Sequence, residues 1–190
     1  IPLSLGYLVN GHDLQYHLLR IEGIKDGLLA GDFPIKIQPN WLNGNGYATS
    51  VFYGDLFIYI PAILRLCGFS VQQSYNIYVL LCNIATCMIS YFCFKGISGR
   101  RKTAVIGAAI YTTSIYRLLD MYVRSSVGEY SAMTFLPLIA YGLWKIYTED
   151  CDGREYEKNW IILVLGFTGI INTHILTCEM VAIFTILLCL

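Results

Sequence analysis

Long apolar stretches separated by short polar segments dominate the pattern of this chain. The clearest is 71–94, because a helix needs about 20 apolar residues to cross a hydrocarbon core roughly 30 Å thick. Shorter runs follow it, and the pattern predicts membrane helices over 71–94, 103–119, 130–147, 159–173 and 175–190. We therefore expect an all-α fold, a polytopic transmembrane bundle forming a single domain over 1–190.

A basic cluster at 95–102 sets the expected topology, because cytoplasmic loops carry an excess of Lys and Arg. The turn 120–129 and the segment around His174 then lie on the external face, and the loop 148–158 is cytoplasmic. The first fifty residues are external too, provided that 55–67 does not cross. That stretch is short for a span and is interpreted as a re-entrant or short helix. A crossing there would place the basic cluster outside.

The external segment 10–54 has an organisation of its own. Asp13 occupies a helix N-cap position, and Gly31 is a typical residue for ending the helix. The spacing between them predicts an amphipathic helix on the membrane surface, with apolar positions at Leu14, Leu18, Ile21 and Leu28. Pro and Gly break any period in 32–53, where Trp41, Tyr47 and Tyr53 are available to rest among the lipid headgroups.

Composition agrees with a membrane protein, since 56% of the residues are hydrophobic and only 14% are charged. Mean hydropathy is +0.55. The 13 basic and 13 acidic residues balance and are dispersed, which excludes the basic field that nucleic acid binding needs. The chain opens on Ile1 and stops inside the apolar run 181–190, so we expect a piece of a longer protein.

Seven cysteines lack any Cys-x-x-Cys pair, and most of them lie in apolar runs. An odd count without ligand spacing favours buried free thiols over disulfides or a metal framework.

Three groups of ionisable residues interrupt this pattern. Asp13, His17 and Arg20 fall within roughly 60° of each other on the predicted helix, where an acid, a base and a cation can meet. In the alternative interpretation Asp13 only caps the helix, while His17 and Arg20 face lipid headgroups.

The second group is 124–129, where Arg124 and a helix N-terminus can hold a phosphate. The alternative is a capping box between Ser126 and Glu129. The third is His174, with Glu179 beyond it, because ionisable groups at membrane depth suggest function. His174 otherwise marks an interfacial turn. The heptad-spaced Asn76, Asn83 and Ser90 are better explained by hydrogen bonds between helices.

With these residues in view, the chain resembles the amino-terminal part of a GT-C-type polytopic membrane glycosyltransferase. Within that group it is most similar to uncharacterised bacterial membrane proteins described as 6-pyruvoyl-tetrahydropterin synthase-related. The resemblance covers nearly all 190 residues. Its motifs are Gly11-His12-Asp13 with His17 and Arg20, Gly31-Asp32-Phe33-Pro34, Gly44-Asn45-Gly46-Tyr47, Tyr53-Gly54-Asp55-Leu56, Arg124 through Glu129 with Pro137, and Thr173-His174.

The resemblance implies an acidic residue in the first external loop, acting as base or metal ligand, and a donor sugar on a polyprenyl phosphate. Asp13 occupies that position, but His12 and Leu14 flank it where many such enzymes have a second carboxylate. No ligand cluster therefore supports a divalent metal, and the cofactor stays unknown. The three histidines also lack the ligand spacing of a pterin synthase zinc site, so a pterin reaction is rejected.

We therefore expect glycosyl transfer at the external face of the cell membrane, with the lipid bilayer and a polyprenyl-phosphate sugar donor as partners. The expected catalytic residues are Asp13, His17, Glu129 and His174, and the expected substrate-binding residues are Arg20, Arg124 and Tyr47. The alternatives are a transporter or flippase for a lipid-linked or anionic solute, and a membrane scaffold. No internal repeat is visible, which favours an enzyme over a transporter. A separation above about 15 Å between Asp13, Arg124 and His174 would favour the scaffold, because catalytic groups must reach one centre.

Overall fold

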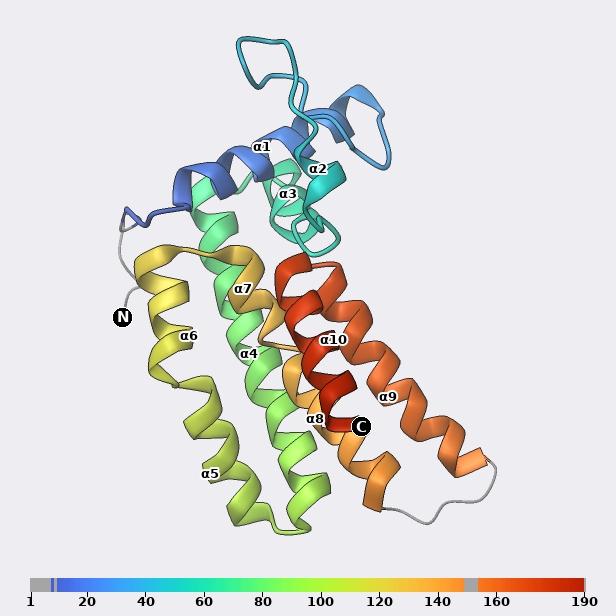
Figure 1. Cartoon of the computed structure of the whole chain (residues 1–190). Helices are drawn as coiled ribbons and strands as arrows, with labels where there is room; N and C mark the ends of the chain where they lie inside the picture. Colours follow the sequence, from blue (N-terminus) through green and yellow to red (C-terminus); the bar gives the residue numbers. More distant parts are fainter. Residues whose placement is uncertain (1–7, 9, 149–153, 190) are drawn as a thin grey trace.

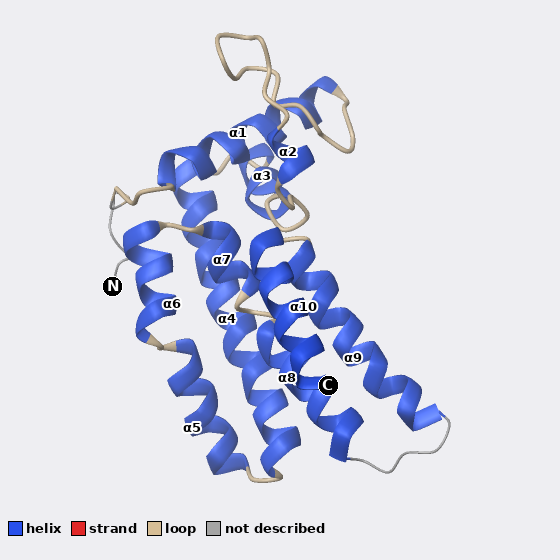
Figure 2. Cartoon of the chain, viewed as in Figure 1, coloured by secondary structure: helices blue, strands red, loops and turns tan. Residues whose placement is uncertain are grey.

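The computed structural model describes residues 8, 10–148 and 154–189, with backbone alone for 154–158. All of the elements named in this part of the chain are helices, which confirms the all-α expectation (Figure 2). The only pairing of strand type in the described residues is an isolated bridge between Gln38 and Tyr47.

Two layers make up the architecture: a bundle of helices along one axis, and a cap of helices across one end of it (Figure 1). Within the bundle α4 packs on α5 and α8 packs on α9. The cap comprises α1 (Leu14–Ala30), α2 (Thr49–Phe52) and α3 (Tyr59–Leu66). The bundle comprises α4 (Val71–Ser98), α5 (Arg101–Thr112), α6 (Ile115–Leu119), the π-helical turn η2 (Asp120–Arg124), α7 (Val127–Ala132), α8 (Leu136–Thr148), α9 (Arg154–Ile171) and α10 (Ile175–Cys189).

Helix α1 begins directly after Asp13 and ends at Gly31, whose φ of 85° is in the left-handed region that glycine favours. Its buried face packs against α3 and α4. Leu14, Ile21 and Ile24 on that face belong to the main apolar core. The helix therefore covers the end of the bundle, and its apolar positions pack against other helices.

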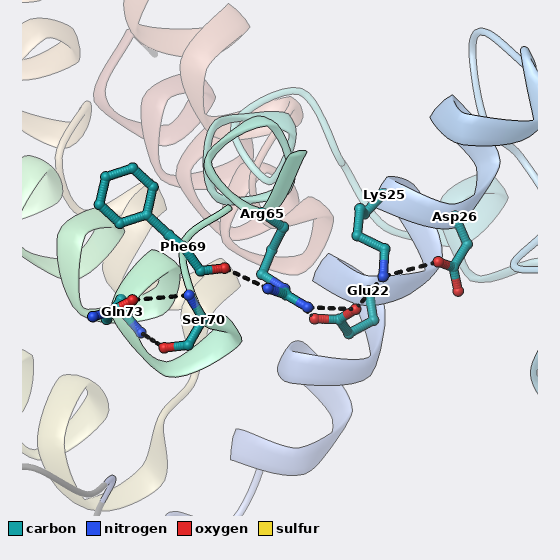
Figure 3. A network of polar contacts seen from close by, with 7 residues as sticks. All are labelled: Glu22, Lys25, Asp26, Arg65, Phe69, Ser70 and Gln73. Atoms are coloured by element: carbon teal, nitrogen blue, oxygen red, sulfur yellow. Dashed lines mark hydrogen bonds and ion pairs between the residues drawn. The ribbon is translucent and has the colours of Figure 1, made fainter. Parts of the chain in front are cut away.

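Polar contacts join α1 to α3, and α3 to the residue before the cap of α4 (Figure 3). Arg65 of α3 pairs with Glu22 of α1 and donates a second hydrogen bond to the carbonyl of Phe69. Directly after it, Ser70 and Gln73 form a capping box that begins α4. With eight residues α3 is only about 12 Å long, so it cannot cross a bilayer.

One helix of the described chain, α4, is long and apolar enough to span a membrane. Its 28 residues extend about 42 Å. The segments 103–119 and 130–147, predicted as single helices, are each divided in two. Ser114 adopts an extended conformation between α5 and α6, and the helix after the second break starts with Pro137 in its first turn, where proline is tolerated.

The interior of the bundle holds polar as well as apolar side chains, and its outer surface is largely apolar. Hydroxyl groups are buried between helices: Tyr78 and Ser131 lie 2.8 Å apart, as do Thr86 and Thr134. The predicted cross-helix bond of Ser90 is wrong, because its hydroxyl bonds within α4 instead. Large apolar side chains are exposed on the outer helices, including Leu80, Ile84, Phe92, Val105, Ile110, Ile161, Leu165, Ile183, Phe184 and Leu187.

The cysteines are partly as expected. The six described ones are free thiols, and Cys93 is buried. Cys67, Cys87 and Cys189 are exposed, however, so the expectation that they are buried is wrong. Cys87 and Cys189 lie on the outer surface of the bundle, and Cys67 lies at the end of α3 in the cap. Cys151 lies outside the described residues.

Candidate functional site

The segment from Arg124 to Glu129, between η2 and α7, is the centre of the candidate site. Asp13 joins it by two hydrogen bonds: its backbone N–H donates to the Arg124 carbonyl at 2.9 Å, and the Ser126 hydroxyl donates to its Oδ2 at 3.0 Å. The Asp13 side chain makes no capping bond to α1. The interpretation of Asp13 as only a helix cap is therefore wrong, because Ser126 holds its carboxylate.

The capping box expected between Ser126 and Glu129 is also absent. Glu129 instead accepts a hydrogen bond from Arg124 at 2.8 Å and one from the Tyr116 hydroxyl at 3.3 Å. Arg124 pairs with a second carboxylate as well, that of fully buried Asp120, at 2.6 Å. The guanidinium of Arg124 thus bridges two acids within the protein.

This bridge sets the protonation of both acids. Burial raises the pKa of Asp120 to about 6, and the neighbouring Glu129 adds to the shift. Burial alone would raise the pKa of Glu129 too, but the hydrogen bonds with Arg124 and Asp120 and the charges of Arg124 and His174 together outweigh it and hold that pKa below its ordinary value. Near neutral pH Arg124 therefore faces two negative charges and is not available as an excess cation.

His17 lies on the buried face of α1 with 4% of its surface exposed, so it does not face headgroups. Its Nδ1 is 3.4 Å from Arg20 Nη1. Because a guanidinium only donates, Nδ1 must accept, and the ring proton is on Nε2. Burial, followed by the charges of Arg20 and His174, lowers the pKa of His17 to about 3. His17 is therefore a neutral hydrogen-bond donor at pH 7 rather than a base.

Arg20 is 1% exposed, and although its Nε has no hydrogen-bond partner, its terminal nitrogens make polar contacts within the cap. It forms an ion pair with Asp55, donates to the Gly54 carbonyl at 3.0 Å, and lies 5.1 Å from the centre of the Tyr53 ring. Its position suits the orientation of His17 better than the substrate contact expected for it. Sequence reasoning missed Asp55 as its partner.

His174 lies between α9 and α10 and packs against the central segment. A Cβ on Gly128 would be 2.9 Å from His174 Cδ2, so only glycine permits this approach. Thr177 N–H donates to His174 Nδ1 at 3.3 Å, which leaves Nε2 as the free ring nitrogen. Burial lowers the pKa of His174, while Glu129 opposes that shift. Glu179, by contrast, is exposed on α10.

Tyr47 is separate from these residues. It stacks on Trp41 with 5.5 Å between ring centres, and Trp41 in turn meets the edge of Tyr16, the neighbour of His17. The structure thus brings Asp13, Arg124, Glu129 and His174 together at one segment. His17 and Arg20 lie on the buried face of α1 in the cap, and Tyr47 lies in the loop between α1 and α2.

A cavity of about 490 Å³ adjoins the site, with α5 and α6 on one side and α10 on the other. Tyr116, Glu129 and His174 form part of its polar end. Arg117 also lines it and was not among the residues expected from sequence. The remaining wall is mostly apolar, from Met133, Leu136, Leu176, Met180 and Val181. Among the described residues no group of three or more His, Cys, Asp or Glu side chains is placed to hold a metal ion.

Comparison with known proteins finds a relative without an assigned function. An uncharacterized protein of Lactococcus lactis subsp. cremoris (strain MG1363) is 23% identical over 180 residues, which make up 93% of this chain and 28% of that protein. The chain thus spans less than a third of the length of this relative. No family model matches the chain, and no solved structure matches it.

Proposed function

We propose that this chain belongs to a multi-pass membrane glycosyltransferase that takes its sugar from a polyprenyl phosphate at the external membrane face. The observation that supports it is the meeting of Asp13, Glu129 and His174 on one short segment beside a cavity with one polar end and an apolar wall. A lipid-linked sugar has the same division between polar and apolar parts.

The surface of the bundle supports a membrane location. Exposed large apolar side chains cover α4, α5, α9 and α10, and contiguous apolar surface is typical of membrane contact. The basic residues at the α4–α5 turn lie at the opposite end of the bundle from α1 (Figure 1). Under the positive-inside rule the candidate site therefore faces outward.

In the proposed reaction an acceptor hydroxyl oxygen attacks the anomeric carbon of the donor, while the bond from that carbon to the phosphate oxygen breaks. Asp13 is exposed and takes the hydroxyl proton, and Ser126 holds its other oxygen. The lipid phosphate leaves with the bonding electron pair. The free Nε2 of His174 is suited to stabilise that charge by hydrogen bonding, and His17 is a second neutral donor.

The arrangement argues against a scaffold. A large separation between Asp13, Arg124 and His174 would favour that interpretation, whereas Asp13 and His174 both contact the segment that begins at Arg124. A cap or anchor also needs no carboxylate held by a side chain 113 residues away.

The proposal is tested by Asp13→Asn in the full-length protein, with Asp32→Asn as control because Asp32 is exposed outside the site. Membranes containing each variant are assayed for sugar transfer from a panel of polyprenyl-phosphate hexoses. We expect Asp13→Asn to slow transfer about 100-fold or more, the loss typical of a general base. Asp32→Asn should match the wild type, and membrane insertion should be unchanged in both. Equal transfer by Asp13→Asn and the wild type would refute the proposal.

A further inference from the structure

Arg117 in α6 is a buried cation without a counter-ion. Its side chain is 1% exposed, and no carboxylate in the described residues lies within ion-pair distance of it. It donates to the Tyr130 carbonyl at 2.7 Å and makes a marginal contact with the Cys82 carbonyl at 3.5 Å. Its Nε has no hydrogen-bond partner.

This arginine differs from the others that the structure places in polar networks. Arg20, Arg65 and Arg124 each meet at least one carboxylate. Arginine stays protonated in proteins, and a buried charge is costly unless it is paired. Carbonyl oxygens satisfy single N–H groups but supply no negative charge. No negative charge among the described residues therefore balances Arg117, and a bound anion would supply one.

The cavity beside Arg117 indicates where such an anion belongs. Arg117, Glu129 and His174 line one cavity, and its apolar wall continues along α8 and α10. The volume of about 490 Å³ is within the range of about 300–1,000 Å³ that is usual for ligand pockets. Since none of the residues of α10 is buried, that wall is not closed over by protein.

We propose that this cavity binds a single-chain anionic amphiphile, with its phosphate at Arg117 and its apolar chain between α8 and α10. The identification of the amphiphile as the polyprenyl phosphate of the sugar donor rests on the proposed function. The unpaired cation and the cavity are observed independently of that function. Arg117, rather than Arg124, then binds the lipid phosphate, because Arg124 is already neutralised by Asp120 and Glu129.

This placement fits the proposed chemistry. A phosphate at Arg117 occupies the cavity that His174 lines, so leaving-group charge develops within one cavity beside a cation and a neutral donor. Arg117 is thus expected to bind both the intact donor and the released lipid phosphate.

The test measures binding to the purified full-length protein in maltoside micelles, whose headgroups carry no phosphate. The probes are farnesyl phosphate, farnesol and inorganic phosphate. The wild type should bind farnesyl phosphate about tenfold or more tightly than farnesol, the preference expected from hydrogen bonds to a charged group. Arg117→Gln should remove this preference and leave farnesol affinity unchanged. Arg101→Gln, at an exposed position on α5 outside the cavity, should behave as the wild type.

A second variant covers the case in which Arg117→Gln fails to fold. Met180 lines the cavity but is 72% exposed, so Met180→Trp should fill the cavity without disturbing the core. It should weaken the binding of farnesyl phosphate and farnesol alike. Unchanged affinity in Met180→Trp would overturn the proposal, and so would equal wild-type affinity for the two probes or a preference that survives Arg117→Gln.

Two further outcomes separate this inference from the proposed function. Competition by phosphatidylglycerol as strong as that by farnesyl phosphate would make the cavity a membrane phospholipid site and overturn the naming of the donor lipid. A phosphate preference that depends on Arg117, found together with sugar transfer unaffected by Asp13→Asn, would support the binding site and refute the proposed role of Asp13.

Discussion

The buried ion pair between Arg20 and Asp55 gives the sharpest prediction about stability. The two side chains are 1% and 8% exposed, and the pair joins α1 to the segment before α3. Asp55→Ala leaves the Arg20 charge buried without its counter-ion. Removal of one partner of such a pair costs about 3–5 kcal/mol. The remaining hydrogen bond to Gly54 and the contact with the Tyr53 ring do not supply the missing charge.

A matched control lies on the same helix. The pair between Arg65 and Glu22 also joins α1 to α3, but its side chains are 23% and 29% exposed. Glu22→Gln should therefore cost at most about 1 kcal/mol. For a domain of 150–250 residues about 1 kcal/mol shifts the melting temperature by about 2–4 °C, so Asp55→Ala should melt about 6 °C or more below the wild type.

Thermal unfolding in detergent, followed by far-UV circular dichroism, measures these shifts. The double variant Arg20→Met with Asp55→Leu should recover most of the loss, because replacing both partners of a buried pair by apolar residues is often neutral. If Asp55→Ala lowers the melting temperature no more than Glu22→Gln does, the pair is not the buried link described above.

Two other measurements test the buried site. The pKa of His17 falls from 6.5 to about 3 on folding, so its contribution to stability is complete above pH 6.5 and declines as the pH falls towards 3, by up to about 1.4 kcal/mol per pH unit. A series of melting experiments across these pH values measures the decline. If the melting temperature of His17→Asn depends on pH as steeply as that of the wild type, this reasoning is wrong. Gly54→Ala should cost about 1–3 kcal/mol in the same melting assay, because its Cβ would lie 2.3 Å from the Asn172 backbone. Gly107→Ala, which meets only the Phe94 side chain, should cost less, and an equal loss would refute that reasoning.

Local signals in the sequence were sufficient for parts of the fold. Asp13 and Gly31 marked the limits of α1, and the apolar run from Val71 identified α4. Other elements depended on backbone changes that hydropathy does not report. The break at Ser114 falls inside the stretch 103–119, which the hydropathy pattern predicts as one helix.

The candidate site shows the same division. The ionisable residues at segment ends were recognisable by their cost in a membrane, and the structure brings Asp13, Arg124, Glu129 and His174 together. Their partners were not recognisable. The sequence of Ser126 and Glu129 matched a capping box. In the folded protein the Ser126 hydroxyl bonds to Asp13 instead, and Glu129 accepts a hydrogen bond from Arg124.

Arg117 could not be found from the sequence, because its significance comes from the lack of a carboxylate within ion-pair distance among the described residues. Such a lack is a property of the whole fold. Asp55 similarly becomes the partner of Arg20 only when two segments 35 residues apart meet.

The contact between Asp13 and Ser126 also determines when the site can exist during synthesis. The two residues are separated by 113 positions, and His174 follows 48 positions after Ser126, as the numbering gives directly. Contacts of such high sequence separation form late, because long loops must close first. A nascent chain that has not yet released His174 from the ribosome therefore has no complete candidate site.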